Sequence, residues 1–253
     1  MILTTSVSWV TAVLLCTLRL AALLLMTPIW QALGLPVRIR VLLVATLAMA
    51  LVSGMQLAVV HAPTDLFSLV MAGVGEVMLG ALMAFGIFVA FAAFSFAGNM
   101  LDLQIGFNIA NIFDPTTRSR SPLIAALLGM VALALFFTMD AHHTMLRGLA
   151  FSFEKIPLGQ MLQLPSPMLL AKQFGTVFSY GLMLAAPAFF CLFLVEMSLA
   201  VLSRNLPQLN IFMLSAPIKI AVGMSVLAYV SGHFASVTTK IFASLFGFWE
   251  DVL

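Results

Sequence analysis

Long apolar runs with few charges dominate this sequence and constrain its fold more than any other feature. Of the 253 residues, 63% are hydrophobic and 8% are charged, and the mean hydropathy is +1.16. Soluble domains carry about 25% charged residues, so this is the composition of an integral membrane protein. The 11 basic and 9 acidic residues give a net charge of +2, which indicates no nucleic-acid partner. We therefore predict an all-α membrane protein surrounded by lipid.

Six apolar segments are long enough to form helices, at residues 7–29, 38–60, 65–97, 123–139, 173–202 and 209–235. The third segment has no proline, and as a single helix it would be ~50 Å long at ~1.5 Å per residue. A hydrocarbon core of ~30 Å needs only about 20 residues. We therefore expect this helix to be broken or to leave the bilayer within an assembly. Pro187 and Pro217 lie inside the last two segments, where we expect kinks.

The sequence predicts a single domain over residues 1–253. Residues 1–6 carry no Lys or Arg, and the apolar run after them is too long for a cleavable signal peptide. We expect this first segment to remain in the mature protein.

Residues 236–253 form an amphipathic C-terminal tail. Its apolar residues recur at helical spacing, opposite Lys240 and Ser244, and they are Ile241, Leu245, Phe248 and Trp249. This pattern predicts a helix that lies at the membrane interface.

Residues 99–122 are a polar, turn-prone stretch between apolar segments. Asn, Asp and Gln side chains alternate there with Leu, Ile and Phe, and Arg118 and Arg120 follow. Gly106 and the dipeptide Asp114-Pro115 indicate turns. Irregular polar backbone in a membrane protein is tolerated only where protein covers it or where it lines a wet cavity. The stretch is therefore a loop that joins two helices or a segment that closes a passage, and composition alone favours the joining loop.

Five ionisable residues lie within or beside the apolar segments, and they are Arg19, Glu76, Asp102, Glu196 and Lys219. A charge at the centre of a membrane-spanning helix costs ~2.5–3.5 kcal/mol, so each should face protein or water. The first interpretation is pairing between helices, for example of Arg19 or Lys219 with Glu76 or Glu196. The second is a proton relay through the carboxylates.

Glu76 lies on a narrow face of small residues. Ala72, Glu76, Gly80 and Ala84 recur every four residues, a spacing that lets a second helix come close. We therefore expect Glu76 and Gly80 to lie in an interface between two helices.

Signals for catalysis or for a bound cofactor are weak. Cys16 and Cys191 lie in apolar runs and are typical of buried side chains rather than of a disulfide or metal pair. Asp140, His142 and His143 suggest a metal or acid–base site, but adjacent histidines point in different directions on a helix. The sequence has no phosphate-binding glycine loop, nucleophile elbow or zinc-protease motif. We expect no catalytic residue, no cofactor and no metal.

Two motifs carry a resemblance to a known family. The first is LQIGFNIANIFDP at residues 103–115, and the second is PQLNIFMLSAPIKIAVG at residues 207–223. Together with PVRIR at residues 36–40, they make the chain similar to the FliR family of type III secretion export-apparatus subunits. The resemblance spans nearly the whole chain.

The second motif departs from the family at two positions. The family pattern has glycine where this chain has Ser215, and a bulkier residue where it has Ala216. Small volume is kept but the backbone freedom of glycine is lost, which weakens any hinge role. The motif-turn residues that the resemblance indicates are Pro207, Gln208, Asn210, Pro217 and Gly223.

The resemblance implies a subunit of the flagellar export gate, in the bacterial inner membrane at the flagellar basal body. About six long, kinked helices would form hairpins within a helical hetero-oligomeric ring, assembled with FliP and FliQ and joined by FlhB. Unfolded flagellar rod, hook and filament proteins would pass through its centre.

A loop of such a subunit would lie in the lumen as a plug, which maps here to about residues 106–122. Its apolar side chains would exclude water, since an apolar constriction blocks ions by dewetting. The predicted plug and pore residues are Gly106, Phe107, Asn108, Ile109, Asn111, Ile112, Phe113, Asp114 and Pro115.

Three other functions remain open from the sequence. The first is the equivalent subunit of a virulence type III injectisome. The second is a small-solute secondary transporter that uses Glu76, Glu196 and Lys219 as a buried ion pathway. The third is an intramembrane enzyme that uses Asp140 and His142.

Overall fold

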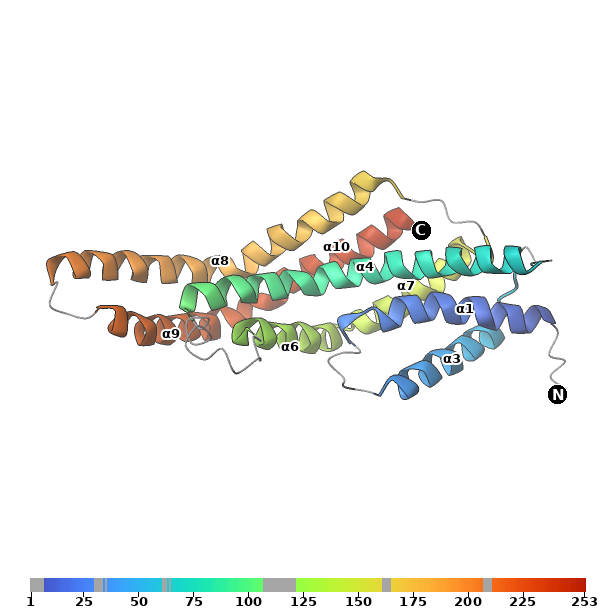
Figure 1. Cartoon of the computed structure of the whole chain (residues 1–253), viewed down its shortest axis with the longest axis horizontal. Helices are drawn as coiled ribbons and strands as arrows, with labels where there is room; N and C mark the ends of the chain where they lie inside the picture. Colours follow the sequence, from blue (N-terminus) through green and yellow to red (C-terminus); the bar gives the residue numbers. More distant parts are fainter. Residues whose placement is uncertain are drawn as a thin grey trace. The chain divides into compact units, whose positions relative to one another are not determined.

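The computed structural model of the chain describes residues 7–29, 34, 36–60, 63, 65–106, 122–160, 165–206 and 211–253. Every regular element within these ranges is a helix, which confirms the predicted all-α fold. The helices are α1 (Val7–Leu25), α3 (Val37–Gly54), α4 (Leu66–Ile105), α6 (Leu123–Thr138), α7 (Ala141–Lys155), α8 (Pro167–Asn205), α9 (Ile211–Val230), the short 3₁₀ helix η2 (Ser231–His233) and α10 (Phe234–Val252) (Figure 1).

Among the described residues, five helices are long and apolar enough to cross a membrane, namely α1, α3, α4, α8 and α9. The pair α6 and α7 is bent at a short break, and together they would make a sixth span. Five or six spans agree with the six apolar segments of the sequence. The chain is an integral membrane protein by the length and composition of its helices.

Helix α4 is continuous over 40 residues, which corresponds to about 60 Å at ~1.5 Å per residue. Its buried face continues past residue 97, the end predicted from the sequence, because Leu101 and Ile105 are fully buried. The first part of the polar stretch is therefore helical through Ile105. An unbroken helix of this length exceeds the thickness of a hydrocarbon core.

Helix α8 is also longer than a hydrocarbon core needs, with 39 residues, and Pro187 lies inside it. A proline in a helix interior removes one hydrogen bond and crowds the carbonyl one turn before it, which favours a kink. Figure 1 shows α8 with a bend along its length. Pro217 lies inside α9 in the same way.

Packing divides the chain into two compact units. The first unit comprises Met1–Val89, Asp140–Gln173 and Ser244–Leu253, and the second comprises Ala90–Met139 and Phe174–Ala243. Helices α4, α8 and α10 contribute to both units. The expectation of a single domain stays a prediction.

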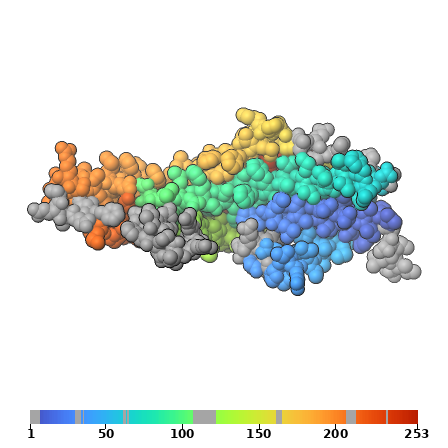
Figure 2. All heavy atoms as spheres, in the orientation of Figure 1, coloured from blue at the N-terminus to red at the C-terminus, as the bar shows by residue number. Residues whose placement is uncertain are grey.

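In the first unit, α1 packs against α3 and against the first half of α4 (Figure 2). Leu15, Cys16, Leu20 and Leu23 are fully buried on α1, and their spacing is that of one helix face. Cys16 is a buried free thiol, whereas Cys191 in the second unit is a half-buried one.

The second unit has an aromatic core. Phe91 of α4 and Phe242 of α10 both pack against Phe136 of α6, with ring centroids 5.9 and 5.6 Å apart. Phe96 of α4 meets Phe178 of α8 edge-on at 5.2 Å. Tilted and edge-to-face contacts of this kind are favoured by the quadrupole of aromatic rings.

The apolar face of α10 packs on protein within the first unit, where the sequence pattern predicted a membrane interface. Phe248 lies edge-on to Phe85 of α4 at 6.0 Å between centroids. Trp249 donates from Nε1 to the carbonyl of Met83 over 3.0 Å. A Cβ on Gly148 of α7 would lie 2.5 Å from the Trp249 ring. The amphipathic pattern thus serves internal packing, because α4 and α7 cover the face.

Candidate functional site

Arg19 of α1 and Glu76 of α4 form a buried ion pair in the first unit. Arg19 Nε donates to Glu76 Oε2 over 2.6 Å, and the two side chains are only 1% and 2% exposed. The structure thus brings together two of the five ionisable residues seen in the sequence. Charge-assisted hydrogen bonds of this length are strong, and removal of one partner leaves the other as an uncompensated buried charge.

Arg19 also closes the C-terminal end of α7. Its Nη1 donates to the carbonyl and to the hydroxyl of Ser152 over 3.0 and 3.2 Å, and Nη2 donates to the carbonyl of Ile156 over 2.9 Å. The guanidinium lies 4.5 Å from the centre of the Phe153 ring. The last carbonyls of a helix have no partner inside it, and the helix dipole favours a cation there. Arg19 therefore joins α1 to the end of α7.

The second oxygen of Glu76 is also occupied. Oε1 accepts a hydrogen bond from the backbone N–H of Gly159 over 3.0 Å, and Gly159 has a positive φ of 81°. We call Arg19, Glu76, Ser152, Ile156 and Gly159 the Arg19 cluster. Since both carboxylate oxygens are held by donors, the geometry favours structural pairing over a proton relay. Ser152, Ile156 and Gly159 contribute mostly backbone groups, which no side-chain pattern could have indicated.

Helix α1 comes very close to α4 at Gly80, one turn beyond Glu76. A Cβ on Gly80 would lie 2.4 Å from the Arg19 carbonyl oxygen and 2.7 Å from Ala22 Cβ. Small residues at such a point let two helix backbones approach closely. The narrow small-residue face of α4 thus lies against α1 where Arg19 reaches Glu76.

In the second unit, Asp102 caps the N-terminus of α6 from the last turns of α4. Its Oδ1 accepts from the N–H of Ile124 over 3.0 Å, and its Oδ2 accepts from the N–H of Ala125 over 3.1 Å. Pro122, the residue before α6, makes no side-chain cap. The first N–H groups of a helix need external acceptors, and a carboxylate is favoured there by the dipole. Asp102 is fully buried because it is satisfied in this way.

Glu196 of α8 bridges two other helices of the second unit. Its Oε1 accepts a hydrogen bond from Lys219 Nζ on α9, and its Oε2 accepts from Gln104 Nε2 on α4 over 3.2 Å. The Glu196 side chain is 41% exposed and that of Lys219 is 19% exposed. This ion pair is therefore less buried than the pair of the first unit. Gln104 was seen in the sequence only as part of the polar stretch.

The motif-turn residues fall into two groups. Pro217 and Gly223 lie inside α9 and form no turn, and a Cβ on Gly223 would lie 2.8 Å from the Ile105 side chain. Ser215 and Ala216 are helical as well. Glycine at position 223 thus permits close packing of α9 on the end of α4. Pro207, Gln208 and Asn210 lie outside the described residues.

The predicted plug lies almost wholly outside the described residues. Gly106 directly follows α4 and has a φ of 92°, a left-handed conformation that glycine adopts without strain. The remaining predicted plug and pore residues lie outside the described ranges, and they are Phe107, Asn108, Ile109, Asn111, Ile112, Phe113, Asp114 and Pro115.

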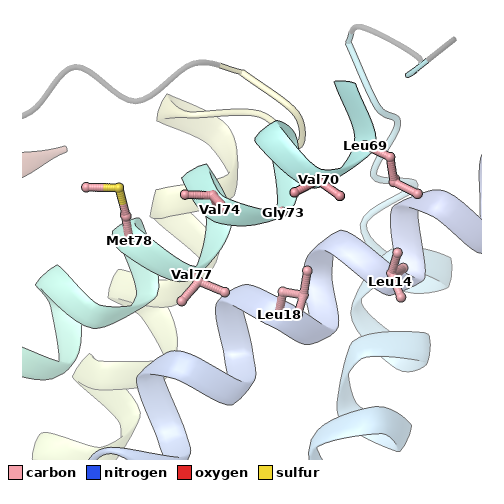
Figure 3. A pocket seen from close by; sticks show the side chains of 8 residues that line it. All are labelled: Leu14, Leu18, Leu69, Val70, Gly73, Val74, Val77 and Met78. Atoms are coloured by element: carbon pink, nitrogen blue, oxygen red, sulfur yellow. The ribbon is translucent and has the colours of Figure 1, made fainter. Parts of the chain in front are cut away.

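An open apolar groove of about 420 Å³ lies between α1 and the start of α4 (Figure 3). Its lining residues are Leu14, Leu18, Leu69, Val70, Gly73, Val74, Val77 and Met78. None of these side chains can act as an acid, a base or a nucleophile. The side chains that line the groove therefore offer no catalytic chemistry.

Comparisons with known proteins agree along nearly the whole chain. A family model described as bacterial export proteins, family 1, matches residues 10–245. The chain is 29% identical to the flagellar biosynthetic protein FliR of Escherichia coli (strain K12), over 97% of this chain and 94% of that protein. It is 33% identical to FliR of Bacillus subtilis (strain 168), over 66% of each chain. It is 30% identical to Yop proteins translocation protein T of Yersinia pestis, over 70% of this chain and 69% of that protein.

Proposed function

Because the chain belongs to the bacterial export proteins, family 1, we propose that it is a subunit of the flagellar type III protein export gate. Membership makes it a component of a type III export apparatus, and its apolar helices make it a membrane protein. In this proposal it lies in the inner membrane at the flagellar basal body. It assembles with FliP-like and FliQ-like subunits, is joined by an FlhB-like subunit, and forms with them a pore for unfolded flagellar proteins.

The observation that carries the flagellar assignment is the nearly full-length match to FliR of Escherichia coli. The Escherichia coli FliR match covers 97% of the chain, whereas the match to the Yersinia translocation protein covers 70%. The injectisome subunit is therefore the second candidate. It is supported by a comparable identity of 30% over the shorter stretch.

Deletion of the gene for this chain in its own bacterium distinguishes the flagellar function from the injectisome function. We expect loss of motility and of secreted filament protein, restored by a plasmid copy, with any injectisome secretion unchanged. Copurification of the chain with FliP-like and FliQ-like subunits tests the proposed assembly. Normal flagella in the deletion strain would contradict the flagellar proposal.

We further propose that residues 106–122 act as a plug within the assembled pore. The ends of this segment are fastened to one another in the second unit, since Asp102 near its start holds the N–H groups of Ile124 and Ala125 just past its end. Gly98 of α4 supports the same attachment, because its Cα faces Ala125 so closely that a Cβ would lie 2.2 Å from the Ala125 Cα. A segment whose two ends are held together can move into or out of a lumen without displacing the helices that it joins, which here are α4 and α6.

Removal of residues 106–115 tests the plug. We expect raised ion leakage in cells that express the assembled gate, measured by membrane depolarisation. A second variant replaces residues 107–115 with a glycine-serine segment of the same length, which keeps the connection but removes the apolar side chains. Both variants should leak if apolar side chains seal the pore. Unchanged leakage from a correctly assembled complex would refute the plug and leave the export assignment intact.

A further inference from the structure

The start of α7 carries three side chains with metal-binding atoms in one place. A carboxylate oxygen of Asp140 and one ring nitrogen each of His142 and His143 all lie within 4.8 Å of one another. His143 Nδ1 is 3.3 Å from Asp140 Oδ1, and the two imidazole rings lie 4.1 Å apart between centroids with a tilt of 37°. The adjacent histidines therefore converge, where the sequence pattern predicted that they diverge.

The local backbone explains this convergence. Asp140 stands directly before α7 with φ 55° and ψ 21°, and makes no side-chain cap of that helix. A residue with left-handed backbone torsions directly before a helix points its side chain in another direction than a residue within the helix does. The carboxylate therefore lies beside the first turn of α7, which contains His142 and His143.

We propose that Asp140, His142 and His143 form a surface site for a divalent transition-metal ion such as Zn²⁺. Two imidazoles and one carboxylate are a donor set that suits Zn²⁺, Ni²⁺ and Cu²⁺ rather than Mg²⁺ or Ca²⁺. Three protein ligands leave a coordination position for water.

The geometry needs only a small adjustment to bind such an ion. Tetrahedral metal–ligand bonds of about 2.0–2.2 Å place the donor atoms about 3.3–3.6 Å apart. The Asp140 and His143 atoms already lie 3.3 Å apart, and the widest separation in the group, up to 4.8 Å, needs to shorten. The side chains of Asp140 and His143 are 75% and 62% exposed, so they can rotate without disturbing a packed core. The Asp140 carboxylate also offsets the partial positive charge of the helix N-terminus, which on its own disfavours a cation.

The competing arrangement is a simple hydrogen bond between His143 and Asp140 at the start of α7, with no metal. The two arrangements make different predictions for ion binding. The metal-site proposal is independent of the proposed export function, since no residue of the Arg19 cluster or of the proposed plug is a ligand in it.

Zinc binding to the full-length chain, purified in detergent without a polyhistidine tag, tests the site. The probe is Zn²⁺ alone, in competition with a chromogenic chelator. We expect one equivalent bound by the native chain, loss of that equivalent in H142A/H143A, and binding weakened about tenfold or more in Asp140→Asn. Asparagine tolerates the left-handed backbone at position 140, so this variant keeps the local fold. His61→Ala, a histidine change elsewhere in the chain, should bind as the native chain does.

A second measurement needs no variant. Zn²⁺ should protect His142 and His143 of the native chain from modification by diethyl pyrocarbonate, detected by mass spectrometry, whereas Mg²⁺ should not. Protection supports the site even if the double variant folds poorly. The proposal would be overturned if the native chain bound no equivalent of Zn²⁺. It would also be overturned if H142A/H143A kept its equivalent and Zn²⁺ failed to protect the two histidines of the native chain.

Discussion

Arg19 Nε and Glu76 Oε2 lie 2.6 Å apart, and both side chains are almost completely removed from solvent. The same guanidinium reaches the carbonyls of Ser152 and Ile156. One side chain of α1 therefore fixes the position of α4 and the end of α7.

Glu76→Gln should lower the free energy of unfolding by about 3–5 kcal/mol, because Arg19 would keep its charge without a counter-ion. Chemical unfolding in detergent micelles, followed by circular dichroism, measures the effect. Glu154→Gln removes an exposed carboxylate from α7 and should change the free energy by less than ~0.5 kcal/mol. A similarly small loss for Glu76→Gln would mean that water reaches Arg19.

Gly80→Ala should destabilise the first unit by about 1–3 kcal/mol, because the added methyl group would collide with the backbone of α1. Gly129→Ala is the matched control, since a Cβ there has no atom within 4 Å. The control should be neutral or stabilising by up to ~1 kcal/mol through helix propensity. Thermal unfolding of the two variants side by side gives the comparison, and equal midpoints would contradict the close crossing at Gly80.

Asp102→Ala should cost about 1–3 kcal/mol, because two buried N–H groups at the start of α6 would lose their acceptors. Asp102→Asn keeps one acceptor oxygen and should lose less. Amide hydrogen exchange at Ile124 and Ala125 reports the cap directly and should become faster in both variants. Asn99→Ala, which changes an exposed side chain one turn earlier on α4, should leave this exchange unchanged.

The ion pair between Glu196 and Lys219 should contribute much less than that of Arg19 and Glu76. Its side chains are partly exposed, and solvated pairs are worth about 0–1 kcal/mol. A double-mutant cycle with Glu196→Gln and Lys219→Met should therefore give a coupling energy below ~1 kcal/mol. A coupling above ~3 kcal/mol would indicate that the pair is desolvated.

Trp249→Ala should loosen the C-terminal helix from α7 and lower stability by about 3–5 kcal/mol, as expected for loss of a buried aromatic ring. Gly148→Ala should act in the same direction from the other side, because its Cβ would overlap the ring. Limited proteolysis of the tail measures the loosening. Asp251→Asn, an exposed change on the same helix, serves as the control, and equal resistance in all forms would argue against the docking of α10.

Several features of the fold could be predicted from the sequence because they depend on local pattern. Apolar length identified the membrane helices, and the four-residue spacing around Glu76 and Gly80 identified the face that α1 packs against. The predicted end of α4 at residue 97 was wrong, because polar residues such as Asn99 and Asp102 suggested that a loop begins there. Asp102 stays in the helix because α6 supplies its hydrogen-bond partners from a distant part of the chain.

The tail shows the same limit. Its amphipathic pattern predicts a helix with one apolar face, but it carries no information on what covers that face. Burial of Phe248 and Trp249 against α4 and α7 satisfies the pattern as well as a membrane interface would. The partners of Arg19 at Ser152 and Ile156, and that of Glu76 at Gly159, were equally hidden. Backbone carbonyls and N–H groups occur at every position, so the sequence does not mark them.

The sequence by itself determined that this chain is a helical membrane protein and to which family it belongs, because hydrophobic length and family motifs are properties of contiguous residues. The tertiary structure decided which charges pair, which helix end each acid or base caps, and that Asp140 and its two neighbouring histidines converge. Pairing and capping depend on groups that are far apart in the chain, so they arise only when the helices have packed. The convergence at Asp140 depends on a single backbone torsion, which residue types alone do not specify.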